Sequence, residues 1–294
     1  MLNPEIALNR RPVDRISRSS RLGALAAAVQ PVVKKLLAGA GPAIADVLHG
    51  RLLGHPLHAV LTDVPIGAWT VTAALDTCEL LGGPVDAGAD NALLVGLAGA
   101  AGAALSGWAD WSDTAGDPRT LGIAHAVVNG TAVTAYLAAL ALRRGARRRL
   151  GLGVSLAAYG VICAGAYLGG ELSFGQLLGA KHTAEPVDPP TDFTPVLDTA
   201  ALPADGPARA GLNGIALLIA RSDRGVSAIA AACTHRGAPL GDGSFAAGCV
   251  TCPWHGSIFG LDDGRVVRGP ATFPQPRFEA RINGDRVEVR ALPI

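Results

Sequence analysis

The sequence predicts an α plus all-β protein of two domains, with an N-terminal four-helix transmembrane bundle and a C-terminal β-sandwich. Its 294 residues are enough for two domains. Hydrophobic residues make up 49% of the chain and charged residues only 17%, which favours a membrane protein. The apolar residues are concentrated in 59–178, whereas 181–294 has the composition of an ordinary soluble domain. The net charge of +1 gives no electrostatic argument for nucleic acid as a partner.

The chain divides into four parts by composition. A basic arm occupies 1–58, the helical membrane domain 59–180, a proline-rich linker 181–192, and the β domain 193–294. The stretch "LGALAAAVQPVVKKLLAGAG" in the arm is amphipathic and indicates a solvated or membrane-surface helix. The basic residues of the arm are Arg10, Arg11, Arg15, Arg18, Arg21, Lys34, Lys35 and Arg51.

Four apolar segments account for the predicted bundle. They cover 61–81, 91–109, 121–142 and 150–170. Each contains about 20 residues, and a helix of that length spans the roughly 30 Å hydrocarbon core of a bilayer. The first segment is the most polar of the four because it contains Asp63, Asp76 and Glu79. An Ala-rich soluble bundle is the alternative, but three successive uncharged segments favour the membrane.

The loops between these segments carry the information on orientation. Five arginines in "RRGARRR" (143–149) favour a cytoplasmic position for the third loop of the bundle. The eight basic residues of the arm favour the opposite orientation, because four spans place the arm and that loop on different sides. The two counts conflict, so the rule predicts no single orientation. The protein is expected in the cytoplasmic membrane as a multi-pass protein.

Short runs of alternating residues, separated by Gly, Asp and Asn turns, follow the linker and predict the β-sandwich. Within it, Cys233-Thr-His235 and Cys252-Pro-Trp-His255 each offer one sulfur and one imidazole, with sixteen residues between them. A tetrahedral zinc site could use two Cys and two His, but zinc fingers usually pair like ligands in sequence. One of each in both stretches suits a two-iron cluster, in which one iron takes the thiolates and the other the imidazoles.

The pattern C-x-H-x₁₆-C-x₂-H with "CPWHG" resembles the Rieske [2Fe–2S] domain, over about 190–294. The resemblance implies that Cys233 and Cys252 bind one iron and that His235 and His255 bind the other. It also implies that "RGPATFPQPRFE" is the proline-rich loop that covers the cluster. The residues it places around the cluster are Trp254, Gly256, Ser257 and, with Gly269, Pro270.

Three positions depart from the Rieske proteins of quinol–cytochrome c oxidoreductases. Ala238 and Trp254 replace the cysteines of a disulfide, and Phe259 replaces a tyrosine that donates a hydrogen bond. With fewer donors, the reduced cluster is stabilised less, so we expect a potential in the lower part of the roughly −150 to +300 mV Rieske range. The pattern is similar to ferredoxin components of ring-hydroxylating oxygenases and small nitrite reductase subunits. The missing disulfide favours a cytoplasmic-facing Rieske domain.

The stretches "GHPLHAVLTDVPIGAW" and "GIAHAVVNG" resemble a family of four-helix membrane domains of unknown function. Four histidines fall at one end of the predicted bundle: His55, His58, His125 and His182. They form a candidate site for haem b, a quinone or a metal, with His58 and His125 as the pair for haem. The alternative is that they cap helices or lie at the membrane interface.

These features predict a membrane-anchored, ferredoxin-like one-electron transfer protein that uses a Rieske [2Fe–2S] cluster. Its expected partners are a reductase or quinol as donor and an oxygenase or cytochrome as acceptor. The alternative is a redox-sensing membrane module, or the iron–sulfur subunit of a larger oxidoreductase or oxygenase system. Only 39 residues follow His255, and none is histidine, so a mononuclear iron site of an autonomous oxygenase is not expected. The sequence thus favours an electron-transfer component over an autonomous enzyme.

Overall fold

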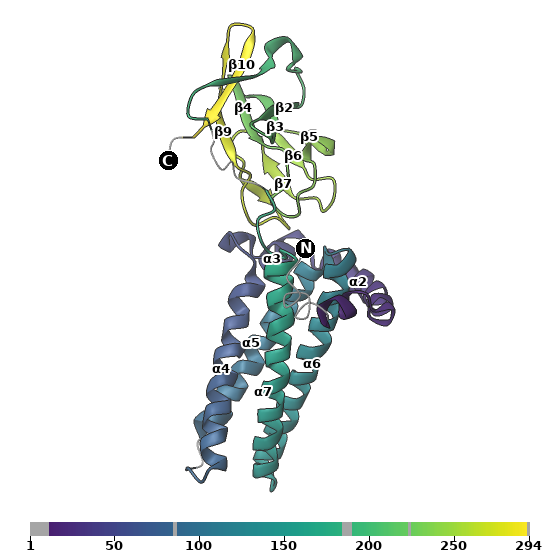
Figure 1. The fold of residues 1–294 in the computed structure, drawn as a ribbon, viewed down its shortest axis with the longest axis vertical. Coiled ribbons are helices and arrows are strands. Elements are labelled where there is room, and N and C mark those ends of the chain that lie inside the picture. The colour runs from purple at the N-terminus through teal and green to yellow at the C-terminus, as the bar shows by residue number, and fades with distance from the viewer. Residues whose placement is uncertain (1–11, 85–86, 184–189, 223–224, 293–294) are drawn as a thin grey trace, which may run out of the picture. The chain divides into compact units, whose positions relative to one another are not determined.

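A computed structural model describes residues 12–84, 87–183, 190–222 and 225–292. Arg10 and Arg11 of the arm, and residues 184–189 of the linker, lie outside this set. The chain forms two compact units, one helical and one mainly β (Figure 1). The helical unit contains the described residues up to Ile44, and Pro56–Leu178. The β unit contains Ala45–His55 and the residues from Gly179 onward, so the chain passes between the units three times.

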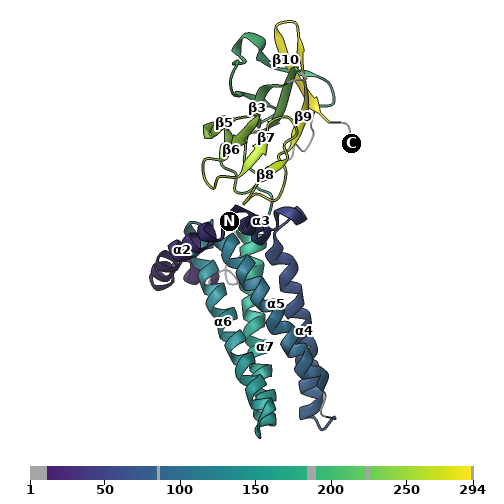
Figure 2. The ribbon, with the colours of Figure 1, turned by 180° about the vertical axis from the view of Figure 1, so that it is seen from behind.

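Four long helices run side by side in the helical unit (Figures 1 and 2). They are α4 (Leu57–Leu80), α5 (Ala87–Ser112), α6 (Gly116–Arg144) and α7 (Arg148–Gly170), the last continued by the π-helical turn η2 (Glu171–Gly175). Helix α4 packs mainly on α5, and α6 on α7. Helix α2 (Ser20–Ala40) crosses one end of this bundle, where it contacts α5 and α6.

Four helices of the described residues are long and apolar enough to cross a membrane. They are α2, α5, α6, and α7 together with η2 (Arg148–Gly175). The predicted first span, 61–81, forms α4, which has 24 residues but is not in this group. The N-terminal domain thus has four membrane-length apolar helices, and α2, predicted as a surface helix, is one of them.

Ion pairs explain how the acidic helix α4 packs in an apolar bundle. Arg143 of α6 forms a salt bridge with Asp76 of α4, and both side chains are fully buried. Arg143 also contacts Asp90 of α5 at 2.9 Å. Arg148 of α7 contacts Glu79 of α4 at 2.7 Å and Asp90 at 3.2 Å. The two arginines therefore join all four helices at this end, and the buried carboxylates are paired as an apolar interior requires.

Small residues let α4 and α5 approach closely along their length. The indole of Trp69 lies against Gly96 and donates a hydrogen bond to the carbonyl of Leu93 at 3.4 Å. A side chain at Gly96 would overlap that ring, so glycine is required there. The other face of the indole stacks on Tyr136 of α6, with ring centroids 4.3 Å apart. Gly96 of α5 thus serves helix packing.

The β unit contains two antiparallel sheets. One has six strands in the order β1-β10-β9-β4-β3-β2, and the other has four in the order β5-β6-β7-β8. The strands are β1 (Thr194–Asp198), β2 (Ala208–Leu212), β3 (Ile215–Ser222), β4 (Gly225–Ala230), β5 (Ser244–Ala246), β6 (Cys249–Thr251), β7 (Ile258–Gly260), β8 (Val266–Arg268), β9 (Arg277–Asn283) and β10 (Arg286–Ala291).

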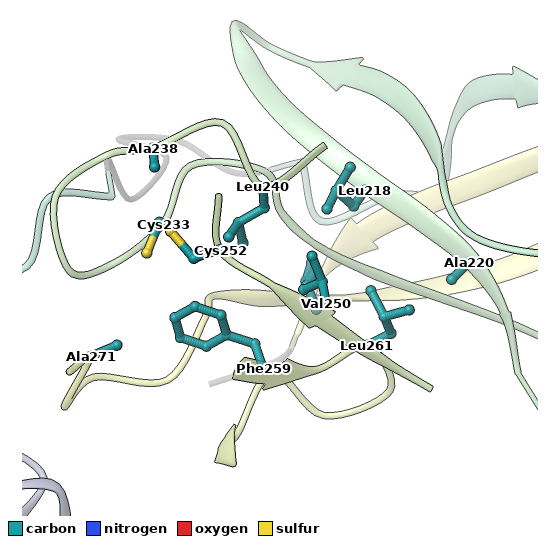
Figure 3. Close-up of a cluster of buried hydrophobic side chains, with 11 residues drawn as sticks. Leu218, Ala220, Cys233, Ala238, Leu240, Val250, Cys252, Phe259, Leu261 and Ala271 are labelled. Atoms are coloured by element: carbon teal, nitrogen blue, oxygen red, sulfur yellow. The ribbon is translucent and has the colours of Figure 1, made fainter. Parts of the chain in front are cut away.

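Strand β3 separates two hydrophobic cores. Leu217 and Ile219 face one core together with residues of β9 and β10, whereas Leu218 faces the other, which includes Val250 and Phe259. This is the period of two expected for a strand buried on both faces. The second core also contains both predicted cysteine ligands (Figure 3). The candidate metal centre is therefore built directly onto the packed interior of the β unit.

Candidate metal centre

The two ligand loops, which follow β4 and β6, share one backbone conformation. In each loop, a glycine follows the cysteine by four residues, and its amide donates to the cysteine carbonyl. The amide of the cysteine itself donates to the carbonyl of the residue after that glycine. The first loop uses Cys233, Gly237 and Ala238 (2.7 and 2.8 Å), and the second uses Cys252, Gly256 and Ser257 (3.1 and 2.7 Å). Both glycines have a φ of +73°, which strains any other residue. Gly256, which the resemblance places beside the cluster, therefore shapes this turn.

The fold brings the four predicted ligands together. The sulfur atoms of Cys233 and Cys252 lie next to each other in Figure 3, and both residues are buried. The rings of His235 and His255 lie with centroids 5.0 Å apart and planes nearly perpendicular. Thiol is thus paired with thiol and imidazole with imidazole. A binuclear cluster with two thiolates on one iron and two imidazoles on the other needs this arrangement, whereas a single zinc ion would need all four donors at one point.

The protonation of these side chains suits metal binding. Burial, and then the neighbouring His255 and Arg236, lower the pKa of His235 to about 2, so its imidazole is neutral at physiological pH. Its Nδ1 atom is buried and has no hydrogen-bond partner among the described residues, as expected for a metal-binding nitrogen. The hydrogen bond between the two thiols lowers the pKa of Cys252 to about 6 and raises that of Cys233. The donor set therefore fits an iron–sulfur cluster.

The loop between β8 and β9 is hydrogen bonded to both ligand loops. The amide of Ala271 donates to the hydroxyl oxygen of Ser257 at 2.9 Å, and the hydroxyl of Thr234 donates to the carbonyl of Phe273 at 2.7 Å. Ser257 and Thr234 are fully buried. This loop contains Pro270, so the predicted proline-rich loop does lie against the ligand residues. The position of Thr234 between Cys233 and His235 is evident in the sequence. Its hydrogen bond to Phe273 could not be predicted from the sequence.

Gln275 is a further supporting residue that the sequence analysis did not identify. With its side-chain amide oriented to satisfy both neighbours, it accepts from the amide of Thr234 at 2.9 Å and donates to the carbonyl of Ala232 at 3.0 Å. It therefore binds the backbone on both sides of Cys233. A glutamine in a proline-rich loop gives no sequence signal for such a role, since the contact depends on tertiary structure.

The remaining residues singled out in the sequence differ in their exposure to solvent. Trp254 is 58% exposed, and its ring lies 6.4 Å from that of His255, so it forms part of the surface beside the ligand. Phe259 and Ala238 are buried in the core that contains the cysteines. Phe259 has no hydroxyl to donate to the cluster. The hydroxyl of the buried Ser257 is therefore the side-chain group that can donate there.

Replacing Ser257 with alanine is expected to lower the midpoint potential of the cluster by about 40–60 mV. The Ser257 oxygen accepts from Ala271, which leaves its hydrogen available to a cluster sulfide. Loss of one such hydrogen bond, worth about 1–1.5 kcal/mol, corresponds to this shift for one electron. A redox titration followed by EPR measures it. Ser244→Ala, a change at an exposed serine in β5, is the control, and equal potentials in both variants would contradict the assignment.

The structure separates the four histidines predicted for the membrane domain. His58 and His125 lie in the helical unit, with ring centroids 6.4 Å apart. His55 and His182 belong to the β unit instead, where the amide of His182 donates to the carbonyl of Thr234 at 3.0 Å. The candidate site in the bundle therefore contains two of the four histidines.

Backbone carbonyls fix the state of the two bundle imidazoles. Nδ1 of His58 lies 2.7 Å from the carbonyl of Ala103, and Nδ1 of His125 lies 3.0 Å from that of Gly165. Since a carbonyl only accepts, each Nδ1 carries the hydrogen. The amide nitrogen of Asn129 lies 3.0 Å from Nε2 of His125 and donates to it. An iron atom on that nitrogen would have to displace Asn129, a residue that the sequence analysis did not single out.

Comparison with known proteins identifies both units. The family described as Rieske [2Fe–2S] domain matches residues 192–279, which include the four predicted ligands. The β unit is a Rieske [2Fe–2S] domain. Its cofactor is the Rieske cluster, as predicted from the two ligand loops. A second family, described as predicted membrane protein (DUF2231), matches residues 54–182. The chain thus joins a C-terminal Rieske domain to an N-terminal predicted membrane domain, and neither match points to haem or quinone.

Two curated relatives match about a quarter of the chain. Apoptosis-inducing factor 3 of Mus musculus and of Homo sapiens are 32% and 33% identical over 75 residues. That match covers 26% of this chain and 12% of each relative. The chain therefore spans about an eighth of the length of either relative.

Solved structures match about a third of the chain. The ferredoxin of carbazole 1,9a-dioxygenase from Nocardioides aromaticivorans IC177 is 24% identical, covers 34% of this chain and 98% of that one, and has a TM-score of 0.32. The cyanobacterial plasma membrane Rieske protein from Synechocystis PCC 6803 is 27% identical, covers 33% and 99%, and has a TM-score of 0.30. Each match therefore covers about a third of this chain and nearly all of the other protein.

Proposed function

We propose that this protein is a membrane-anchored one-electron carrier, ferredoxin-like in its chemistry. The observation that carries the proposal is the paired arrangement of two thiols and two imidazoles in a Rieske domain, on a chain that also has membrane-length apolar helices. When bound, the cluster supplies one reversible electron. The chain holds the cysteines in a buried core and exposes Trp254 beside His255, which leaves an edge of the ligand region accessible to partners.

The acceptor is proposed to be an oxygenase or a cytochrome, and the donor a reductase or a quinol. Among related structures, one records the complex of reduced oxygenase and oxidised ferredoxin in carbazole 1,9a-dioxygenase. An oxygenase as partner of the present protein is a proposal by analogy with that system. The Rieske domain is proposed to face the cytoplasm, because positions 238 and 254 hold no cysteines for a disulfide. Protease accessibility in oriented vesicles tests the orientation.

A quinol donor has one specific observation in its favour. His58, His125 and Asn129 place three polar side chains within the helices of the bundle, where polar groups are costly and usually functional. His58 carries its hydrogen on Nδ1, so its Nε2 atom is an acceptor suited to a quinol hydroxyl, whereas Nε2 of His125 already accepts from Asn129. Oxidation of one quinol releases two electrons and two protons and would therefore support two one-electron reductions.

Transient kinetics with the full-length protein in lipid nanodiscs test the function. The protein is mixed with menaquinol, or with NADH and a ferredoxin reductase, and cluster reduction is followed by visible absorbance. Reduction within a catalytic timescale, followed by rapid reoxidation by an oxygenase or cytochrome, supports the carrier. Slow reduction by every donor would instead favour a redox sensor. Menaquinol reduction that is lost in His58→Ala but kept in His55→Ala would assign the donor site to the bundle.

A further inference from the structure

Three residues of the proline-rich loop, each two positions apart, form hydrogen bonds to other segments. The partner of one of them lies far away in the sequence. Ala271 and Phe273 bond to Ser257 and Thr234, which belong to the ligand loops. The amide of Gly269 donates instead to the carboxylate of Asp46 at 2.9 Å, across 223 residues. Asp46 lies outside the residues matched by the Rieske family, 192–279, and before the first helix of the bundle.

Asp46 is fixed in position by its own surroundings. It lies in α3 (Pro42–His49), and the segment Ala45–His55 is part of the β unit. One carboxylate oxygen accepts from Gly269, while the other forms a 2.8 Å ion pair with Nε of Arg51. The Asp46 side chain is only 14% exposed. Both oxygens therefore have charged or amide donors, and the pair is partly protected from screening by water.

Glycine at position 269 makes the contact possible. A Cβ atom built there would lie 3.0 Å from the Asp46 oxygen, closer than ordinary packing allows. The carboxylate thus approaches the backbone at a glycine, and any other residue there would push it away by a few tenths of an ångström. The family resemblance assigned Gly269 to the covering loop, and this structure adds a reason for glycine at that position.

We propose that Asp46 is a positioning residue of the iron–sulfur centre, which acts through Gly269 to hold the proline-rich loop closed against the ligand loops. Residues 45–55 are then a functional part of the Rieske domain, supplied from the N-terminal side of the membrane domain. The inference rests on the Rieske domain and not on the identity of the electron donor or acceptor. A hydrogen bond to a charged acceptor stabilises the closed loop, so its loss raises the open population roughly tenfold to hundredfold.

The test compares the full-length holoprotein with Asp46→Ala, Asp46→Asn and Arg51→Ala. Hydrogen–deuterium exchange is read on a peptide that contains Gly269, and cluster loss in air is followed by absorbance. We expect Asp46→Ala to accelerate exchange at that peptide about tenfold or more and to speed cluster loss, with the β9–β10 hairpin unchanged. Asp46→Asn keeps an acceptor oxygen, so its exchange rate should lie nearer that of the unmodified protein.

Asp198→Ala is the matched control, because Asp198 also pairs with an arginine of the β unit, Arg286, but is 63% exposed. It should leave both rates unchanged. Unchanged exchange and cluster loss in Asp46→Ala would overturn the proposal, and so would an Asp46→Asn protein as fast as the alanine variant. If Asp46→Ala does not fold, Arg51→Ala decides: a faster exchange at Gly269 supports the proposal, and an unchanged rate overturns it.

Discussion

Replacing Cys252 with serine is expected to leave the protein without its iron–sulfur cluster. Cys252 is buried beside Cys233, and the hydrogen bond between their thiols lowers its pKa to about 6, so it is the sulfur that ionises more easily. A serine hydroxyl is a harder and less acidic ligand and does not replace a thiolate on iron. Iron and acid-labile sulfide should fall to near zero per chain, and the EPR signal of the dithionite-reduced protein should disappear.

Cys249→Ser provides the control within the same segment. Cys249 lies three residues earlier, in β6, and pairs with Gly260 of β7 in the sheet register. It is half-buried and is not one of the four residues brought together at the centre. The Cys249→Ser protein should keep its full iron and sulfide content. A protein that loses the cluster on changing Cys249, or keeps it on changing Cys252, would be incompatible with the ligand assignment.

Replacing Arg143 with methionine is expected to destabilise the helical unit by about 3–5 kcal/mol. Arg143 pairs with Asp76, and neither side chain is exposed. Removal of the arginine leaves a carboxylate without its counter-charge in an apolar interior, which costs more than the pair contributed. Denaturant unfolding of the protein in detergent micelles, followed by helical circular dichroism, measures the loss.

Two further variants separate this effect from a general loss of positive charge. Arg144 is the next residue along the helix and is exposed, so Arg144→Met should change stability by less than about 0.5 kcal/mol. The double variant Arg143→Met with Asp76→Leu removes both buried charges and should recover most of the stability. Equal destabilisation by Arg143→Met and Arg144→Met would show that the buried pair is not the cause.

The candidate ligands could be predicted because the pattern that indicates them is local. Each pair of Cys and His lies within four residues, and the glycine that closes each turn follows at a fixed spacing, so the motif is complete in a short segment. The membrane-length helices were likewise visible, since length and apolar composition are properties of continuous stretches. The assignment of individual spans was harder. Asp76 and Glu79 of α4 count against it in composition, yet they are paired with arginines of other helices.

Residues close together in the chain therefore predict the candidate metal ligands, and they identify the class of cofactor and the membrane domain, because each of these depends on a short continuous stretch. Which distant residues complete these features depends on how the chain folds. The tertiary structure joins Asp46 to Gly269, Thr234 to Phe273 and Arg143 to Asp76, and it divides the four predicted histidines between two units. These contacts arise from folding over long separations, and no local pattern specifies which carboxylate reaches which amide or arginine.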